Sequence, residues 1–124
     1  VGNANFAAGS NNIFSGANNI LKGMDNTLMG DFNTVLGHKN DLTGSQNQIV
    51  GNATTIIGDY NIVKGNFNNI THNNNTVVGD NNNANGSVNV ALGSNNNING
   101  NNNLVGGNKN NIEGDNNTLK GSQN

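Results

Sequence analysis

The chain has 124 residues, a formal net charge of −2, and no cysteine, proline or tryptophan. Its five lysines are scattered, so the sequence has no basic patch for a phosphate backbone and predicts no nucleic-acid partner. No apolar run is long enough to span a bilayer, which predicts no membrane insertion, and the lack of cysteine excludes disulfides and thiolate metal sites.

A glycine recurs at every seventh position from Gly2 to Gly121, with His72 as the one substitute. Asn stands three residues after each of these positions, except at Thr54, and an apolar residue stands two further on. The repeat G-[NDS]-x-N-x-h-x thus continues through eighteen heptads without an insertion. Such strict repetition predicts a single solenoid domain over residues 1–124, whose function lies on a repeated surface.

Each heptad predicts one strand and one corner. A coiled coil needs two apolar positions per heptad, whereas this repeat has one, together with Gly and Asn, which are unfavourable in a helix. The stretch x-N-x-h-x alternates as a strand does, so the first strand is expected at residues 4–8, the next at 11–15, and the last at 116–120. Gly followed by Asn, Asp or Ser supplies the tight corner. Two heptads close a flattened coil of 14 residues, which predicts an all-β parallel β-roll of about nine coils.

The alternation also predicts which side chains point inward. The aliphatic residue enters the core, and the Asn lies inside the bend, where its amide can bond corner backbone groups and the Asn of the next coil. His72 is expected to be a strained structural corner, because His tolerates the left-handed region better than most residues, and Thr54 a weak rung. The predicted Asn ladder consists of Asn19, Asn33, Asn47, Asn61, Asn75, Asn89, Asn103 and Asn117.

Successive heptads fall on opposite sheets, so outward residues sort by alternation. The sheet that starts with the first heptad shows mostly apolar residues and Thr, whereas the other is predicted to be a solvated face. An exposed apolar strip of this extent usually marks a contact surface. The candidate contact face consists of Ile20, Thr34, Leu36, Val50, Ile62, Thr76, Val78, Val90, Leu92, Leu104 and Thr118.

Catalytic chemistry is not indicated. The two histidines lie more than two coils apart, and the serines that follow corner glycines are expected to form turns. Aspartates also recur at this corner position, where Asx turns are expected because the calcium-binding nonapeptide G-G-x-G-x-D is absent. These residues are Asp31, Asp59, Asp80 and Asp115. The sequence therefore predicts no enzyme, no metal site and no cofactor.

Written from the Asn, the unit is x-x-N-x-[VIL]-x-G, as in NTVLG at 33–37, NIVKG at 61–65, NTVVG at 75–79 and NTLKG at 117–121. Over the entire chain, this unit resembles the ice-recrystallisation-inhibition repeat of grass ice-binding proteins. The resemblance implies a left-handed parallel β-roll with a valine core, internal Asn ladders, one flat ice-binding face of Thr, Ser and Val, and a location in the plant apoplast. The chain departs from the family on that face, where larger residues replace small ones. These are Phe6, Lys22, Leu36, Lys64 and Lys120.

A second motif, NVALG at 89–93, resembles the S-V-A-I-G strands of trimeric autotransporter adhesin heads. Those heads are also left-handed β-rolls, and their outward apolar residues meet at a three-fold axis. Two functions follow from these resemblances. The first is ice binding, with an ice surface as partner. The second is an extracellular structural module with copies of itself or a host surface as partner, either an adhesin head or a filament subunit; the strip of Leu, Val and Ile and two unpaired strand edges favour a filament. A spacer with an irregular outer face is a third interpretation of the sequence.

Overall fold

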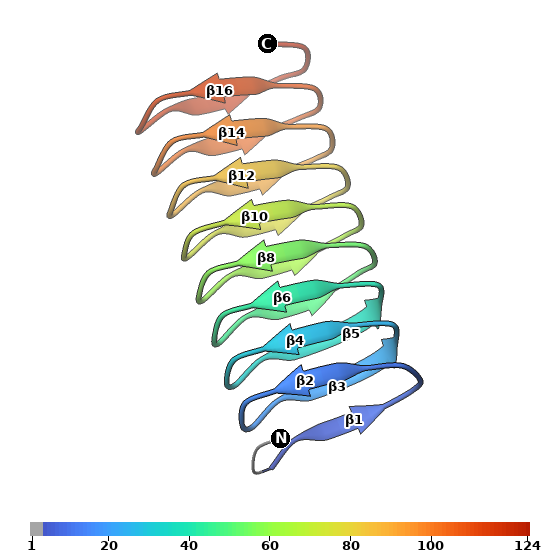
Figure 1. The fold of residues 1–124 in the computed structure, drawn as a ribbon. Coiled ribbons are helices and arrows are strands. Elements are labelled where there is room, and N and C mark those ends of the chain that lie inside the picture. Colours follow the sequence, from blue (N-terminus) through green and yellow to red (C-terminus); the bar gives the residue numbers. More distant parts are fainter. Residues whose placement is uncertain (1–3) are drawn as a thin grey trace.

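The computed structural model describes residues 4–124. In this part of the chain 17 strands form two sheets, one of nine and one of eight strands, and there is no helix. Figure 1 shows the chain winding as a stack of flattened coils, each with one strand in the front sheet and one behind it. The predicted all-β parallel β-roll is confirmed, with about eight and a half coils in the described residues (17 strands, two per coil).

The odd-numbered strands form sheet A and the even-numbered strands form sheet B. Sheet A contains β1 (Phe6–Ala8), β3 (Ile20–Met24), β5 (Thr34–His38), β7 (Gln48–Val50), β9 (Ile62–Lys64), β11 (Thr76–Val78), β13 (Val90–Leu92), β15 (Leu104–Gly106) and β17 (Thr118–Lys120). Sheet B contains β2 (Ile13–Ser15), β4 (Thr27–Met29), β6 (Asp41–Thr43), β8 (Thr55–Ile57), β10 (Asn69–Thr71), β12 (Asn83–Asn85), β14 (Asn97–Asn99) and β16 (Asn111–Glu113).

Each residue of a strand pairs with the residue fourteen positions later. In sheet A, Thr76 pairs with Val90, and Val90 pairs with Leu104. The same register holds in sheet B, where Asn83 pairs with Asn97. Because the register never slips, equivalent positions of the heptad form straight columns along the stack.

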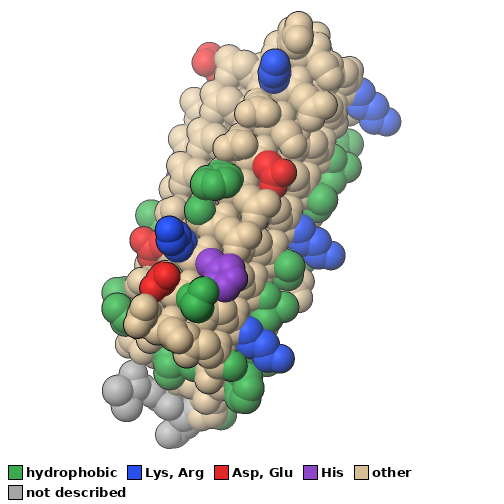
Figure 2. Space-filling model, turned by 90° about the vertical axis from the view of Figure 1, so that its right-hand side faces the viewer, with side chains coloured by type: hydrophobic (Ala, Val, Ile, Leu, Met, Phe, Trp, Pro, Cys, Tyr) green, Lys and Arg blue, Asp and Glu red, His purple; other side chains and the backbone are tan. Residues whose placement is uncertain are grey.

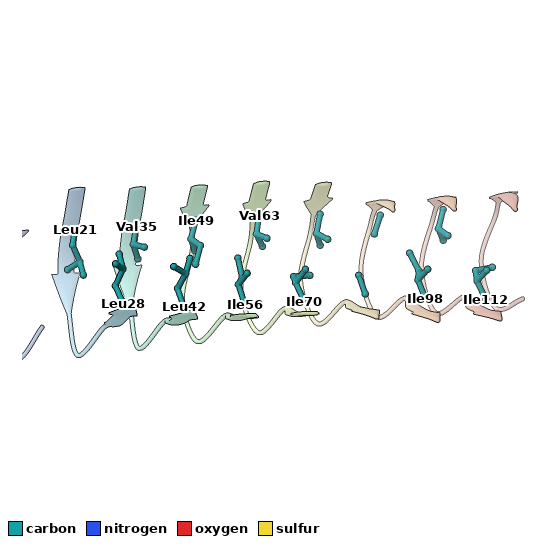
Figure 3. Packing of buried hydrophobic residues seen from close by; sticks show 14 residues of the cluster. Leu21, Leu28, Val35, Leu42, Ile49, Ile56, Val63, Ile70, Ile98 and Ile112 are labelled. Atoms are coloured by element: carbon teal, nitrogen blue, oxygen red, sulfur yellow. The ribbon is translucent and has the colours of Figure 1, made fainter. Parts of the chain in front are cut away.

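The core is a double row of aliphatic side chains between the two sheets. In Figure 3, Leu21, Val35 and Ile49 of sheet A point toward Leu28 and Leu42 of sheet B. All fourteen members of this cluster, from Leu21 to Ile112, are at most 5% exposed. The predicted inward position of the aliphatic residue is therefore confirmed for every coil that has described neighbours on both sides.

The Asn ladder is confirmed in its geometry. Asn19 Nδ2 donates to the carbonyl oxygen of corner residue Gly30 at 2.8 Å, and Asn19 Oδ1 accepts from the backbone N of Asn33 at 2.8 Å. A second ladder follows the opposite side of the roll, where Asn26 Nδ2 donates to Gly37 O at 2.8 Å and Asn26 Oδ1 accepts from Asn40 N at 2.9 Å. No buried side-chain nitrogen or oxygen among the described residues lacks a hydrogen-bond partner. The ladders thus replace the water that would otherwise solvate the corners.

Thr54 is the weak rung that the sequence predicts. Its Oγ1 lies 3.4 Å from Gly65 O, whereas the Asn rungs reach their corner carbonyls at 2.7 to 2.9 Å. The backbone N of Thr54 still donates to Asn40 Oδ1 at 3.0 Å. A hydroxyl is shorter than an amide and has one proton, so it cannot bridge both the corner and the next coil.

Replacing Asn61 by Ala is expected to lower the free energy of unfolding by roughly 1 to 3 kcal/mol, because it leaves buried backbone groups without partners. Asn61 is fully buried, donates to His72 O at 2.9 Å and accepts from Asn75 N at 2.8 Å. Chemical denaturation measures the change. Ile62→Ala is the control, since Ile62 is 42% exposed on sheet A. An equal loss in both variants would contradict the assigned directions of these side chains.

The corner glycines are required by the close stacking of the coils. A Cβ added to Gly93 would lie 2.0 Å from the carbonyl oxygen of Gly107 in the next coil, and the φ of Gly93 is +124°. The second residue after each glycine is also left-handed, even where it is bulky, as at Phe32 (φ 58°), Tyr60 (φ 59°) and Val88 (φ 62°). This second left-handed position could not be predicted from the sequence, because unlike the glycine position it admits almost any residue type.

His72 is a strained corner, as predicted. Its φ is 79°, and the backbone bond from Gly86 N to Thr71 O is stretched to 3.3 Å, against 2.9 Å for the bond from Gly93 N to Val78 O. His72 carries a Cβ at a corner position where, at Gly93 for example, a Cβ would meet the backbone of the next coil.

The expectation of Asx turns at the corner aspartates is wrong. Asp31 Oδ1 accepts from Ala17 N at 2.7 Å, and Asp59 Oδ1 accepts from Ser45 N at 2.7 Å, so each carboxylate bonds the preceding coil. Asp80 and Asp115 accept from Asn66 N and Asn101 N in the same way. The position after the glycine favours Asn, Asp and Ser because each supplies an acceptor for a backbone N–H fourteen residues earlier.

Candidate functional site

The surface of the described residues consists of the outward sides of the two sheets and the corners that join them. Residues 4–124 contain no pocket and no group of three or more His, Cys, Asp or Glu side chains that could hold a metal ion. The same residues include no helix that could cross a membrane.

All eleven residues of the candidate contact face lie on the outward side of sheet A, in two parallel columns. The first column contains Ile20, Thr34, Ile62, Thr76, Val90, Leu104 and Thr118. The second column contains Leu36, Val50, Val78 and Leu92. Column positions on adjacent strands are about 4.8 Å apart along the stack, and the two columns, which are two residues apart in each strand, are separated by roughly 7 Å.

The regularity of this face follows from the core beneath it. Each residue of the first column stands between two inward residues, as Thr76 does between Asn75 and Val77, which are fully buried, and each residue of the second column follows an inward residue. The outward side chains are at least partly exposed, with Val78 at 40% and Leu92 at 46%. The face thus presents methyl groups and hydroxyls at fixed intervals on a rigid support, which suits contact with a flat repeating surface.

Threonines recur on the face every third coil, at Thr34, Thr76 and Thr118. The five residues that depart from the grass pattern also belong to sheet A. Lys22, Lys64 and Lys120 are exposed in the second column, and the ammonium of Lys22 lies 5.7 Å from the ring centroid of Phe6. The lysines divide the face, and its longest stretch without a charge runs from β11 to β15.

Sheet B presents a polar face toward its C-terminal end, as expected from its sequence. Asn69 Nδ2 donates to Asn83 Oδ1 at 3.2 Å, Asn83 to Asn97 at 2.7 Å, and Asn97 to Asn111 at 2.7 Å. The sequence predicts a solvated face at these residues but not the hydrogen bonds between them. The signal was present, because Asn recurs at the same position of four alternate heptads.

Comparison with known proteins assigns the chain to a family. No curated protein matches it. The family model described as a grass antifreeze beta roll matches two overlapping stretches, residues 6–100 and 42–124, which together cover nearly the whole chain. The matched residues include every strand of both sheets, the core row and both Asn ladders. The chain therefore belongs to the grass antifreeze beta-roll family.

Proposed function

We propose that the protein binds ice through the outward face of sheet A and thereby inhibits ice recrystallisation. The observation that carries this proposal is the family match across residues 6–124 on a roll with one flat face of methyl groups and hydroxyls. Because the family is one of antifreeze proteins, ice is the proposed ligand. We also propose that this protein acts outside the cell.

The mechanism follows from the spacing of the face. Thr hydroxyls can hydrogen-bond water, while the methyl groups of Thr and Val offer no competing partner, so water over the columns is held in an ordered layer. An ordered layer of this kind can merge with an ice lattice. Protein adsorbed in this way prevents water from moving from small crystals to large ones.

Sheet A suits this role better than sheet B. The Asn side chains in the outward columns of sheet B already bond one another, so fewer of their polar groups are available to hold water. On sheet A, the stretch from β11 to β15 combines Thr76, Val78 and Val90 without a charged residue. We therefore place the main contact with ice on these three strands.

Thr76→Arg is expected to weaken recrystallisation inhibition several-fold at an unchanged melting temperature, because a long charged side chain would hold the face away from the lattice. Thr76 points outward from β11 and is only partly buried, so the core is not disturbed. The measurement is ice-crystal growth in frozen sucrose solution over a protein dilution series, together with thermal unfolding.

Asn97→Arg, on the exposed face of sheet B, is the matched control and should retain the parent's activity. Equal loss in both variants would contradict sheet A as the contact face. The absence of ice shaping by the unmodified protein at high concentration would refute ice binding itself. In that case light scattering would show whether sheet A is instead buried between copies of the chain, as in an adhesin head or a filament.

A further inference from the structure

The charges of the molecule are segregated by face. The outward side of sheet A carries Lys22, Lys64 and Lys120 and no acidic residue. All seven acidic residues and the other two lysines lie on sheet B and the corners. The face therefore has a charge of +3 and the remainder −5 (2 − 7), which together give the net charge of −2.

The three lysines of sheet A have no acidic partner among the described residues, although the ammonium of Lys22 lies 5.7 Å from the ring centroid of Phe6. All are exposed, and none forms an ion pair within residues 4–124. Figure 2 shows sheet A in profile along its right-hand edge, where basic and hydrophobic side chains follow one another along the rod. The hydrophobic side chains between the lysines include Val50 (41% exposed), Ile62 (42%) and Leu92 (46%).

The arrangement matches a plane of negative charge better than a single anion. Lys22 and Lys64 are three coils apart and Lys64 and Lys120 four coils apart, which places them about 14 and 19 Å from one another at a strand spacing of about 4.8 Å. These separations exceed the Debye length of about 8 Å at physiological ionic strength, so each lysine acts on its own part of the partner. A flat partner with regularly distributed negative charge can engage all three together.

We propose that sheet A adsorbs to the surface of an anionic lipid bilayer, with its lysines at the headgroups and the intervening aliphatic side chains in the interfacial region. Charge complementarity selects this partner, since the acidic remainder of the molecule is repelled and turns sheet A toward the membrane. The exposed aliphatic residues favour a lipid interface over a nucleic acid, which would offer phosphates without an apolar layer. The protein adsorbs as a folded rod and does not insert.

This inference uses the same face as the proposed ice binding but depends on different residues. Ice contact depends on Thr76 and its uncharged neighbours, and the lysines interrupt this regular array. Lipid contact, in contrast, depends on the lysines. The two partners should therefore compete for sheet A. Anionic vesicles added to a frozen sample are expected to reduce recrystallisation inhibition, and neutral vesicles are not.

The test compares two double variants that remove equal charge from different faces. Lys64→Gln/Lys120→Gln changes sheet A, and Lys39→Gln/Lys109→Gln changes the exposed corners between the sheets. Each variant and the parent are sedimented with vesicles of phosphatidylcholine containing one quarter phosphatidylglycerol at low salt, and with pure phosphatidylcholine vesicles. The parent should bind the anionic vesicles alone and be released by 1 M salt.

The sheet A variant is expected to bind about 30-fold more weakly, because each lysine near an anionic surface contributes about five-fold. The corner variant should stay within two-fold of the parent. Equal weakening in the two variants, or unchanged binding by the sheet A variant, would overturn the proposal, as would sedimentation of the parent without lipid through self-association. Thermal unfolding confirms that both variants are folded.

The same variants separate this proposal from ice binding. Lys64→Gln/Lys120→Gln should inhibit recrystallisation at least as well as the parent, and Thr76→Arg should inhibit it several-fold less while binding anionic vesicles at least as tightly as the parent. Loss of ice activity alone thus leaves the lipid proposal intact, and loss of vesicle binding alone leaves ice binding intact.

Discussion

Ile56→Asp is expected to lower the free energy of unfolding by about 3 to 5 kcal/mol, the largest loss expected from a single side chain in this roll. Ile56 lies in β8 near the middle of the stack and has no exposed surface. The core is one aliphatic side chain deep on each sheet, so a carboxylate at this position has neither water nor a cationic partner. Denaturant unfolding followed by circular dichroism measures the loss.

The control is the adjacent residue, Ile57→Asp. Ile57 belongs to the same strand but is 55% exposed, so its replacement should change stability by less than about 1 kcal/mol. If both variants unfold at the same denaturant concentration as the parent, the core does not lie where the structure places it.

Gly107→Ala is expected to cost about 3 kcal/mol, because it combines an unfavourable backbone conformation with a clash between coils. The φ of Gly107 is +121°, and a Cβ would lie 1.7 Å from the carbonyl oxygen of Gly121. The two nearest atoms, the carbonyl oxygen and carbon of Gly121, belong to the backbone, so the clash can be relieved only if the two coils separate. Thermal unfolding and hydrogen exchange of the last coils would detect the change.

The neighbouring residue supplies a matched control, since the chain contains Gly106 and Gly107 in succession. A Cβ at Gly106 would meet only Lys120 Cγ, at 3.9 Å, and its φ is not positive. Gly106→Ala should therefore be close to neutral or slightly stabilising in β15. A comparable loss in both variants would indicate that strand disruption, and not corner stacking, explains the requirement for glycine.

The charge distribution of sheet A suggests a face with two competing demands. Ice contact favours small, uncharged, evenly spaced side chains, whereas Lys22, Lys64 and Lys120 break the regularity and offer positive charge. If both proposals hold, replacing the three lysines by Thr should strengthen ice activity and weaken lipid adsorption. The composition of this face would then be a balance between two partners.

Most of the fold could be predicted from the sequence, because the heptad carries its own register. Each heptad contains one aliphatic residue, one Asn and one Gly at constant spacing. A strand that buries the aliphatic residue and the Asn and turns at the Gly satisfies all three positions. The heptad pattern predicts four features that are confirmed. These are the inward direction of Ile56 beside the outward Ile57, the ladder at Asn61, the weak rung at Thr54 and the strained corner at His72. Handedness, the extent of the domain and the identity of the functional face stay predictions.

Only the tertiary structure decided which groups meet between coils. Asp31 was expected to bond within its own turn, but its partner is Ala17 N, fourteen residues earlier. Phe32 and Val88 have left-handed backbone conformations, which could not be predicted from their residue types. Stacking against neighbouring coils outweighs the preference of these residues for negative φ. The heptad spacing determined the direction of each side chain, since alternation is a local property of a strand. The partners of the corner residues depended on how one coil lies on the next.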